Sequence, residues 1–449
     1  MRAIVVQPWR WGVALAVVLA VAARPAAAQS TLIQADGVVN AGYTQTTRSV
    51  FQADPKADAP DVKNSSVGGA FTELRPTITF QGGSPRVTWR AGYTFSANFS
   101  LGGTQGTSYG NQANGALVAE LTQDTMLTFT AALAQGGTAF LLSQPAAQDG
   151  KPAIRAQGNP SLVSGTVTEA LSWQAGRHLA FKHNLNASLS APQDDLSQSS
   201  TAVAAAFSLE QLFTRDTLGL ELHLGVAWLR PQRLDEPNYA SVTNALLARW
   251  NHDFSVGWNG LATAGMEQVF TDTGSRPLAF LPTGSLSVRY TAGTTAGGLE
   301  LSHGTATNLQ VGAVSITDRL AAHAVITLDE RKLRAFSFSA GILHNQPIGE
   351  VSPEVLAATG NAVQVDAGFA TQLAKNLLLV ARYSAAYQFD QGGGLGATLA
   401  HIALVGVSGT WSNSEKARRP LPHQGDRVDG GDSEGFRVVP DAPEPEQGR

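Results

Sequence analysis

A regular alternation of apolar and polar side chains runs through residues 86–99 and limits what this chain can fold into. Val87, Trp89 and Tyr93 belong to the apolar set, while Arg86 and Arg90 belong to the polar set. Side chains of an extended strand point alternately to opposite faces, so this pattern predicts a strand with one apolar and one polar face. Its 14 residues exceed the ~5–6 residues of an ordinary strand and cover the ~9–11 residues that a tilted membrane strand needs.

The same period recurs along most of the chain, for example over residues 179–189, 218–228, 254–264 and 379–389. Charged residues make up only 15% of the chain, against about 25% in a typical soluble domain. The mean hydropathy is −0.05, which is too low for a helical membrane protein. We therefore predict an all-β fold, a transmembrane antiparallel β-barrel that hides its apolar face by alternation.

The predicted connections alternate in length. Short turns are predicted at residues 82–85, 123–125, 175–177, 251–253 and 373–376. Longer polar, glycine-rich loops are predicted at residues 49–67, 100–114, 135–162, 230–238, 271–282 and 345–360. Short periplasmic turns and long outer loops are typical of outer-membrane barrels. A direct tally gives about 19 strands, but single-chain barrels have an even number, so we expect about 18, with 16 or 20 left open by residues 283–344.

Both ends of the chain differ from the alternating part. Arg2 and Arg10 precede an apolar segment and small residues at 26–28, which predicts a signal peptide over residues 1–28. Residues 29–411 form the predicted barrel, and residues 412–449 are predicted to be a disordered periplasmic tail. This tail is either inert or a tether to a periplasmic partner. The chain has no cysteine and a net charge of −4, so we expect no disulfides, no thiolate metal site and no nucleic-acid partner.

Alternation also predicts which charged side chains face the lumen. The predicted inner acids are Glu73, Glu120, Glu210, Glu221, Glu267, Glu300 and Asp366, and the predicted inner bases are Arg75, Arg86, Arg90, Lys182, Arg249, Arg289 and Arg382. Pairing through the predicted turn at residues 82–85 places Thr77 opposite Arg90. A group of Glu73, Arg75, Arg86 and Arg90 on one wall would then narrow the pore and set its selectivity. The alternative is that the inner charges only neutralise one another.

Five tryptophans lie near predicted strand ends on apolar faces, where aromatic rings favour the membrane interface. They are Trp89, Trp173, Trp228, Trp250 and Trp411. The alternative is that they fill the core of a soluble β-sandwich. Glu169 falls on an apolar face and Pro76 lies inside a predicted strand, so we expect a β-bulge near each. His183, His303 and His401 also fall on apolar faces.

The sequence contains none of the common catalytic motifs, and its nine histidines lack metal-ligand spacing. We therefore expect no enzyme activity, no cofactor and no metal. Strand-like alternation starts directly after the signal peptide, which leaves no room for an N-terminal plug domain.

The signal peptide, the alternation, the loop asymmetry and the last strand at residues 401–411 resemble bacterial outer-membrane β-barrel proteins. That strand ends at Trp411 and contains Gly406, although the family usually ends at the aromatic residue and this chain continues. Residues 299–320 resemble a hairpin of the barrels encoded with exopolysaccharide export systems. This second resemblance implies a periplasmic export protein that hands polymer to the barrel.

The sequence thus predicts a conduit in the bacterial outer membrane, with the surrounding lipid as one partner. The leading interpretation is export of a secreted polysaccharide together with a periplasmic export partner. The alternatives are a general diffusion porin for small solutes, an outer-membrane enzyme or an adhesin.

Overall fold

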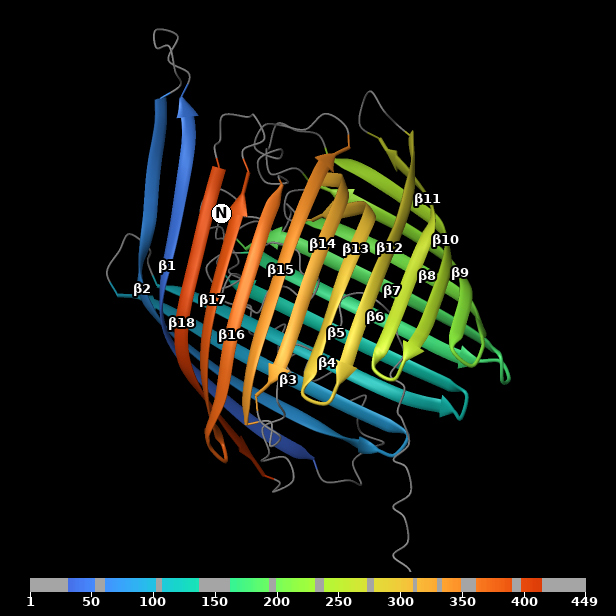
Figure 1. The fold of residues 1–449 in the computed structure, drawn as a ribbon, viewed down its shortest axis with the longest axis horizontal. Helices are drawn as coiled ribbons and strands as arrows, with labels where there is room; N and C mark the ends of the chain where they lie inside the picture. The colour runs from blue at the N-terminus through green and yellow to red at the C-terminus, as the bar shows by residue number, and fades with distance from the viewer. Residues whose placement is uncertain are drawn as a thin grey trace, which may run out of the picture.

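The chain folds into one closed antiparallel sheet of 18 strands, shown in Figure 1. The computed structural model describes residues 31–52, 61–101, 107–136, 162–193, 199–230, 238–272, 278–309, 313–328, 333–348, 361–389 and 397–413. Each strand pairs with its neighbours in the sequence, and the first strand also pairs with the last, which closes the sheet. The predicted all-β barrel and the expected strand number are both confirmed.

The strands are longer than those of soluble sheets, as the alternating segments indicated. Their bounds are β1 (Leu32–Gln52), β2 (Asp61–Ser84), β3 (Val87–Ser100), β4 (Ser108–Thr122), β5 (Thr125–Gly136), β6 (Leu162–Gln174), β7 (Leu179–Pro192), β8 (Ser200–Leu212), β9 (Asp216–Leu229), β10 (Tyr239–Ser255), β11 (Trp258–Thr271), β12 (Leu278–Ala292), β13 (Thr295–Asn308), β14 (Ala313–Thr327), β15 (Arg334–Pro347), β16 (Ala362–Ala374), β17 (Leu377–Gln388) and β18 (Ala397–Ser412).

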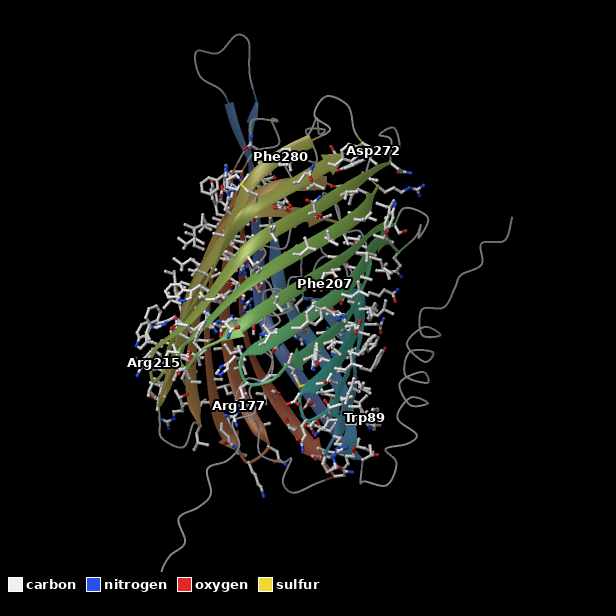
Figure 2. All side chains as sticks on the ribbon, turned by 90° about the vertical axis from the view of Figure 1, so that its right-hand side faces the viewer. Trp89, Arg177, Phe207, Arg215, Asp272 and Phe280 are labelled. Atoms are coloured by element: carbon white, nitrogen blue, oxygen red, sulfur yellow. The ribbon has the colours of Figure 1, made fainter. Side chains whose placement is uncertain are left out.

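The two ends of the barrel differ in their connections. Connections from each even strand to the next odd strand are short, and they define the short-turn end, where β1 begins and β18 ends. Most connections from odd to even strands are longer, and they define the long-loop end. Figure 2 shows Trp89 and Arg177 near the short-turn end, with Asp272 and Phe280 near the long-loop end. The predicted alternation of connection length is therefore present.

The outer face of the barrel is apolar. Large side chains such as Leu220, Leu246 and Leu301 point outward and are more than half exposed, whereas the intervening positions carry small, polar or charged residues. Among the described residues no helix is long and apolar enough to cross a membrane. Closed antiparallel barrels with such a belt cross the bacterial outer membrane, where lipid covers the apolar side chains. The protein is a bacterial outer-membrane β-barrel.

The predicted register between β2 and β3 was wrong. Thr77 pairs with Thr94, and Arg90 pairs with Gln81, because the turn lies at Pro85 and Arg86. Gly82 and Gly83 looked like turn residues but continue β2 opposite Trp89 and Thr88. Proline fits the first central position of a turn because its φ angle is fixed near the value required there.

The predicted turn at residues 251–253 was also wrong, because these residues belong to β10. The chain turns at Val256 and Gly257, and Gly257 has a φ of 94°, which only glycine adopts without strain. Asn251 and Asp253 instead accept hydrogen bonds from the Asn259 side-chain amide at 2.7 and 2.8 Å. Similarly, β1 and β2 extend into the predicted loop 49–67, and β4 begins inside the predicted loop 100–114.

The bulges expected at Pro76 and Glu169 are not present. The β2–β3 ladder omits Arg75 and Pro76 and then resumes in the same register, since proline has no N–H to donate. The ladders on both sides of Glu169 are continuous. The predicted signal peptide, most of the predicted loop 135–162 and the predicted tail beyond residue 413 lie outside the described residues, and Ser412, predicted as the first tail residue, still belongs to β18.

Candidate functional site: the charged inner wall

Four charged side chains on neighbouring strands form a continuous network on the inner wall. Lys182 on β7 contacts Glu210 on β8, with 2.9 Å between Nζ and Oε2. Arg249 on β10 lies between two acids: its Nε is 3.6 Å from Glu210 Oε1, and its Nη1 is 2.6 Å from Glu221 Oε1. We call Lys182, Glu210, Glu221 and Arg249 the inner-wall network.

The register of β8, β9 and β10 explains why these side chains meet. Gly219 on β9 pairs with Glu210 on one side and with Arg249 on the other. A Cβ atom on Gly219 would lie 2.9 Å from the Leu209 carbonyl oxygen and 3.1 Å from Glu210 Cγ. Glycine at this position therefore leaves the space in which the side chains of Glu210 and Arg249 come together.

Polar neighbours complete the inner-wall network. Ser208 donates to Glu210 Oε1 at 3.0 Å, and His223 Nε2 lies 3.2 Å from Glu221 Oε2. Glu210, Glu221 and Arg249 are all buried. Buried charges are costly unless they are paired and hydrogen-bonded, so the network holds its members in a fixed arrangement on the wall.

A second group lies on β1 and β2. Glu73 is 1% exposed and receives a hydrogen bond from Asn40 Nδ2 at 2.7 Å and a contact from Arg75 Nη2 at 3.1 Å. The Asn40 side chain can take this position only because residue 406 on β18 is a glycine. A Cβ atom on Gly406 would lie 1.8 Å from the Asn40 side-chain oxygen. Gly406 thus has a packing role beside the acid.

A third group lies on β16 and β17. Arg382 Nη2 is 3.0 Å from Asp366 Oδ1. Gln364 donates to Asp366 Oδ2 at 2.8 Å, and Ser384 donates to Oδ1. On β13 and β14, Arg319 Nη1 contacts Glu300 Oε1 at 3.2 Å. Sequence reasoning did not single out Arg319, Asn40 or Gln364, although each lies on the inward-facing side of its strand and alternation could have identified it.

The group of Glu73, Arg75, Arg86 and Arg90 is not assembled in the structure. Glu73 and Arg75 are in contact, but Arg86 is exposed in the turn. Arg90 is exposed and pairs with Gln81, eight residues along β2 from Glu73, which corresponds to roughly 26 Å along a strand. The shifted register accounts for this difference.

Glu267 and Arg289 occupy inward-facing positions on β11 and β12. Glu267 is buried and accepts hydrogen bonds from the backbone N–H and the hydroxyl of Thr305. Arg289 pairs with Asn259 and Gly298 in the two ladders.

The five tryptophans lie on the outer face. Trp89, Trp173, Trp250 and Trp411 are close to the short-turn end, and Trp228 is close to the long-loop end of β9. Trp250 lies further from its strand end than expected, because β10 continues to Ser255, and its Nε1 donates to Asp216 at 2.9 Å. Their action as membrane anchors stays a prediction.

Several bases of the inner wall are more exposed than the acids they contact: Arg75 at 22% against Glu73 at 1%, Lys182 at 21% against Glu210 at 3%, and Arg382 at 25% against Asp366 at 12%. The order is reversed on β13 and β14, where Glu300 is 40% exposed and Arg319 is 18% exposed. Within the described part of the chain, no three His, Asp or Glu residues are grouped so that they could hold a metal ion. This arrangement can guide and filter ions.

No protein-family model and no curated protein matches the sequence. Solved structures that match this chain include OccK9 (OpdG) of Pseudomonas aeruginosa, with 10% identity, a TM-score of 0.42, and coverage of 85% of this chain and 98% of that chain. A BenF-like porin from Pseudomonas fluorescens Pf-5 has 13% identity, a TM-score of 0.40 and coverage of 84% and 98%. The ferric-catecholate import receptor Fiu from E. coli K12 has 8% identity, a TM-score of 0.43 and coverage of 85% and 82%.

Proposed function

We propose that this protein is an outer-membrane channel for the passive diffusion of small polar solutes. The observation that carries the proposal is the contrast between the two faces of the closed barrel. The outer face is apolar, while the inner face carries paired charges and small polar side chains on strands all around the wall. A polar inner wall is the property that lets water and hydrated solutes enter a barrel of this size.

The inner wall favours small anions over small cations. Arg75, Lys182 and Arg382 are more exposed than the acids they contact, whereas Glu300 is the single strongly exposed acid among the paired inner charges of the described strands. Rings of charged side chains set selectivity through the sign of the charge nearest the permeating ion. Because each base is paired, the preference should be weak.

Polysaccharide export with a periplasmic partner is the second candidate function. It depends on the resemblance of residues 299–320, which form most of β13 and the first half of β14. Such export would require a second protein to open or load the barrel, whereas passive diffusion requires none. This difference decides between the two candidates.

The test is single-channel conductance of refolded protein, residues 29–449, in a planar bilayer without any partner. Stable openings with weak anion preference, blocked by sugar polymers above a size limit, are expected for a diffusion channel. Folding is checked independently by the heat-dependent shift on a gel. Folded protein that never conducts would contradict the proposal and would direct the search to a periplasmic partner.

A further inference from the structure

The barrel wall is interrupted between β12 and β13 toward the long-loop end. Their ladder contains nine residue pairs, from Ala292–Thr295 up to Gly284–His303. Beyond that point β12 continues to Leu278 along β11, and β13 continues to Asn308 along β14. Within the described residues, these are the only adjacent strands that both continue for more than one residue past the end of their shared ladder. We call this interruption, which can be located from the labels in Figure 1, the β12–β13 seam.

The sequence accounts for the seam. Pro282 lies two residues beyond the last pair, where the continued register would place Thr305 opposite it. Proline has no N–H and is confined to edges and irregular positions of sheets. Gly284 and Gly304 flank the same point, and glycine permits the backbone to bend there.

Side chains close the base of the seam in place of the ladder. The Glu267 carboxylate on β11 accepts a hydrogen bond from the Thr305 backbone N–H at 3.0 Å and a second one from the Thr305 hydroxyl. The Thr283 hydroxyl donates to the His303 carbonyl at 3.0 Å. These are single contacts that can separate without breaking a strand.

The two sides of the seam overlap. His303 and Asp318 form a contact on the outer face of the barrel. By the alternation of side chains, Thr305 on β13 and Val314 on β14 lie on the same side of their strands as this pair. However, Thr305 contacts inner-face Glu267, and Val314 is only 1% exposed in a cluster with Leu229 and Val269, which are inner-face residues of β9 and β11. Near the long-loop end, β13 and β14 therefore lie on the lumen side of β11 and β12.

Apolar side chains line this overlap from the lumen to the lipid. Leu281, Leu309 and Ile348 pack against the cluster that contains Val314. On the outer face, Phe280 beside the seam is 63% exposed, and Figure 2 shows it near the long-loop end. A molecule that parts the two layers would thus contact apolar groups once it has passed the polar contacts of Glu267 and Thr305, and it would meet no ladder between β12 and β13.

We infer that the β12–β13 seam is a lateral passage through which small apolar molecules move between the mouth of the lumen and the outer leaflet of the membrane. The contact between Glu267 and Thr305 holds it closed. This passage is separate from the polar route along the lumen and takes a different class of solute.

The seam can be locked by an engineered disulfide, because the chain has no cysteine of its own. A Cβ on Gly304 would lie 3.7 Å from Thr283 Cβ, within the ~3.5–4.5 Å that a disulfide requires. The variant is Thr283→Cys/Gly304→Cys. The matched control is Gly225→Cys/Thr243→Cys, which has a corresponding distance of 3.8 Å and joins the uninterrupted pair β9 and β10.

The probe is N-phenylnaphthylamine, an apolar dye that fluoresces in lipid, added to porin-deficient cells that express each barrel. We expect the oxidised seam variant to take up the dye no faster than cells without the barrel, and a reducing agent to restore uptake. The control disulfide should leave uptake unchanged. Ion conductance of the oxidised seam variant should persist, which separates this inference from the proposed channel function.

Three results would overturn the inference. They are equal uptake in the oxidised and reduced seam variant, no excess uptake with the wild-type barrel, and a parallel loss of ion conductance on oxidation. Glu267→Ala provides an independent test, because removal of the carboxylate should raise dye uptake. Its control, Glu300→Ala, removes an inner acid that contacts Arg319 on β14, below the seam. Unchanged uptake in Glu267→Ala would contradict closure by Glu267.

Discussion

Lys182 and His183 are adjacent on β7, yet they contact acids on opposite sides of the barrel wall. Lys182 points inward to Glu210, with 2.9 Å between the charged atoms, and joins the inner-wall network. His183 points outward to Glu169 on β6, with 3.2 Å between Nε2 and Oε1, beside the ring of Phe207. Because successive side chains of a strand point to opposite faces, one step along β7 separates an acid–base pair in the water-filled lumen from one on the lipid-facing surface.

The two pairs differ in their surroundings. In the inner pair, Glu210 Oε1 has two further partners, the Ser208 hydroxyl and Arg249 Nε. The outer pair is surrounded by apolar positions such as Leu171, Leu185 and Val167. Pairing offsets the cost of removing charge from water only where the remaining lone pairs are also satisfied. We therefore expect the inner network to stabilise the barrel and the outer pair to lower its stability.

Loss of Arg249 should have the largest effect. Arg249→Met leaves Glu210 and Glu221 buried with one cation fewer between them, and removal of one partner from a buried charge network costs about 3–5 kcal/mol. The free energy of unfolding in urea, measured in lipid vesicles, should fall by this amount. Arg90→Met is the control, because Arg90 is exposed and should change stability by less than about 0.5 kcal/mol. Equal effects of the two substitutions would show that the network is not structural.

Replacement of the outer pair should act in the opposite direction. Glu169→Leu/His183→Leu fills the same surface with groups that suit lipid, and such replacements are neutral or stabilising by about 1–4 kcal/mol. His183→Leu alone is the control, since it leaves Glu169 without its acid–base partner and should destabilise the barrel. A double variant less stable than the wild type would mean that Glu169 and His183 together stabilise the barrel, contrary to the expectation.

Much of the fold was predictable because it depends on a period of two that every strand repeats. The order of short and long connections and the inward side of Lys182, Glu210 and Arg249 follow from this pattern. The strand number also needed the rule that single-chain barrels have an even number of strands, because the pattern alone gave a tally of about 19. Register was less predictable, because it depends on one or two turn residues. The turn lies at Pro85 and Arg86, but the nearby Gly82 and Gly83 resemble turn residues. The prediction therefore placed the turn too early and paired Thr77 with Arg90 instead of Thr94.

Contacts that skip a strand were beyond sequence reasoning. Glu267 on β11 contacts Thr305 on β13 only because the wall opens between β12 and β13. Pro282 was a local signal of irregularity, but alternation alone cannot show which neighbouring strand then moves inward. The outer pair of Glu169 and His183 was visible as two exceptions to the pattern, and the register of β6 and β7 was needed to bring them together.

A smaller effect is expected from a single base of the inner wall. Arg382→Gln keeps a hydrogen-bonding group near Asp366 but removes the charge that is exposed to the lumen. A unit charge attracts an anion and repels a cation 4 Å away in water by about 1 kcal/mol each, so the anion-to-cation permeability ratio should fall by a factor of about 30 at most. The reversal potential in a salt gradient measures this ratio. Arg177→Gln, at an exposed turn residue, is the control, and an equal change there would place the selectivity outside the lumen.

The smallest effect is expected at Arg86, where register and alternation gave different answers. Alternation placed Arg86 on the inner wall beside Arg90, whereas the structure places it in the exposed turn between β2 and β3. A charge in bulk solvent is screened over about 10 Å at 0.1 M salt, so Arg86→Gln should leave the reversal potential unchanged at that concentration. The comparison with Arg382→Gln at the same salt concentration is direct, because both substitutions remove one positive charge. A shift for Arg86→Gln as large as that for Arg382→Gln would mean that the short-turn end, rather than the wall with its paired charges, selects the permeating ion.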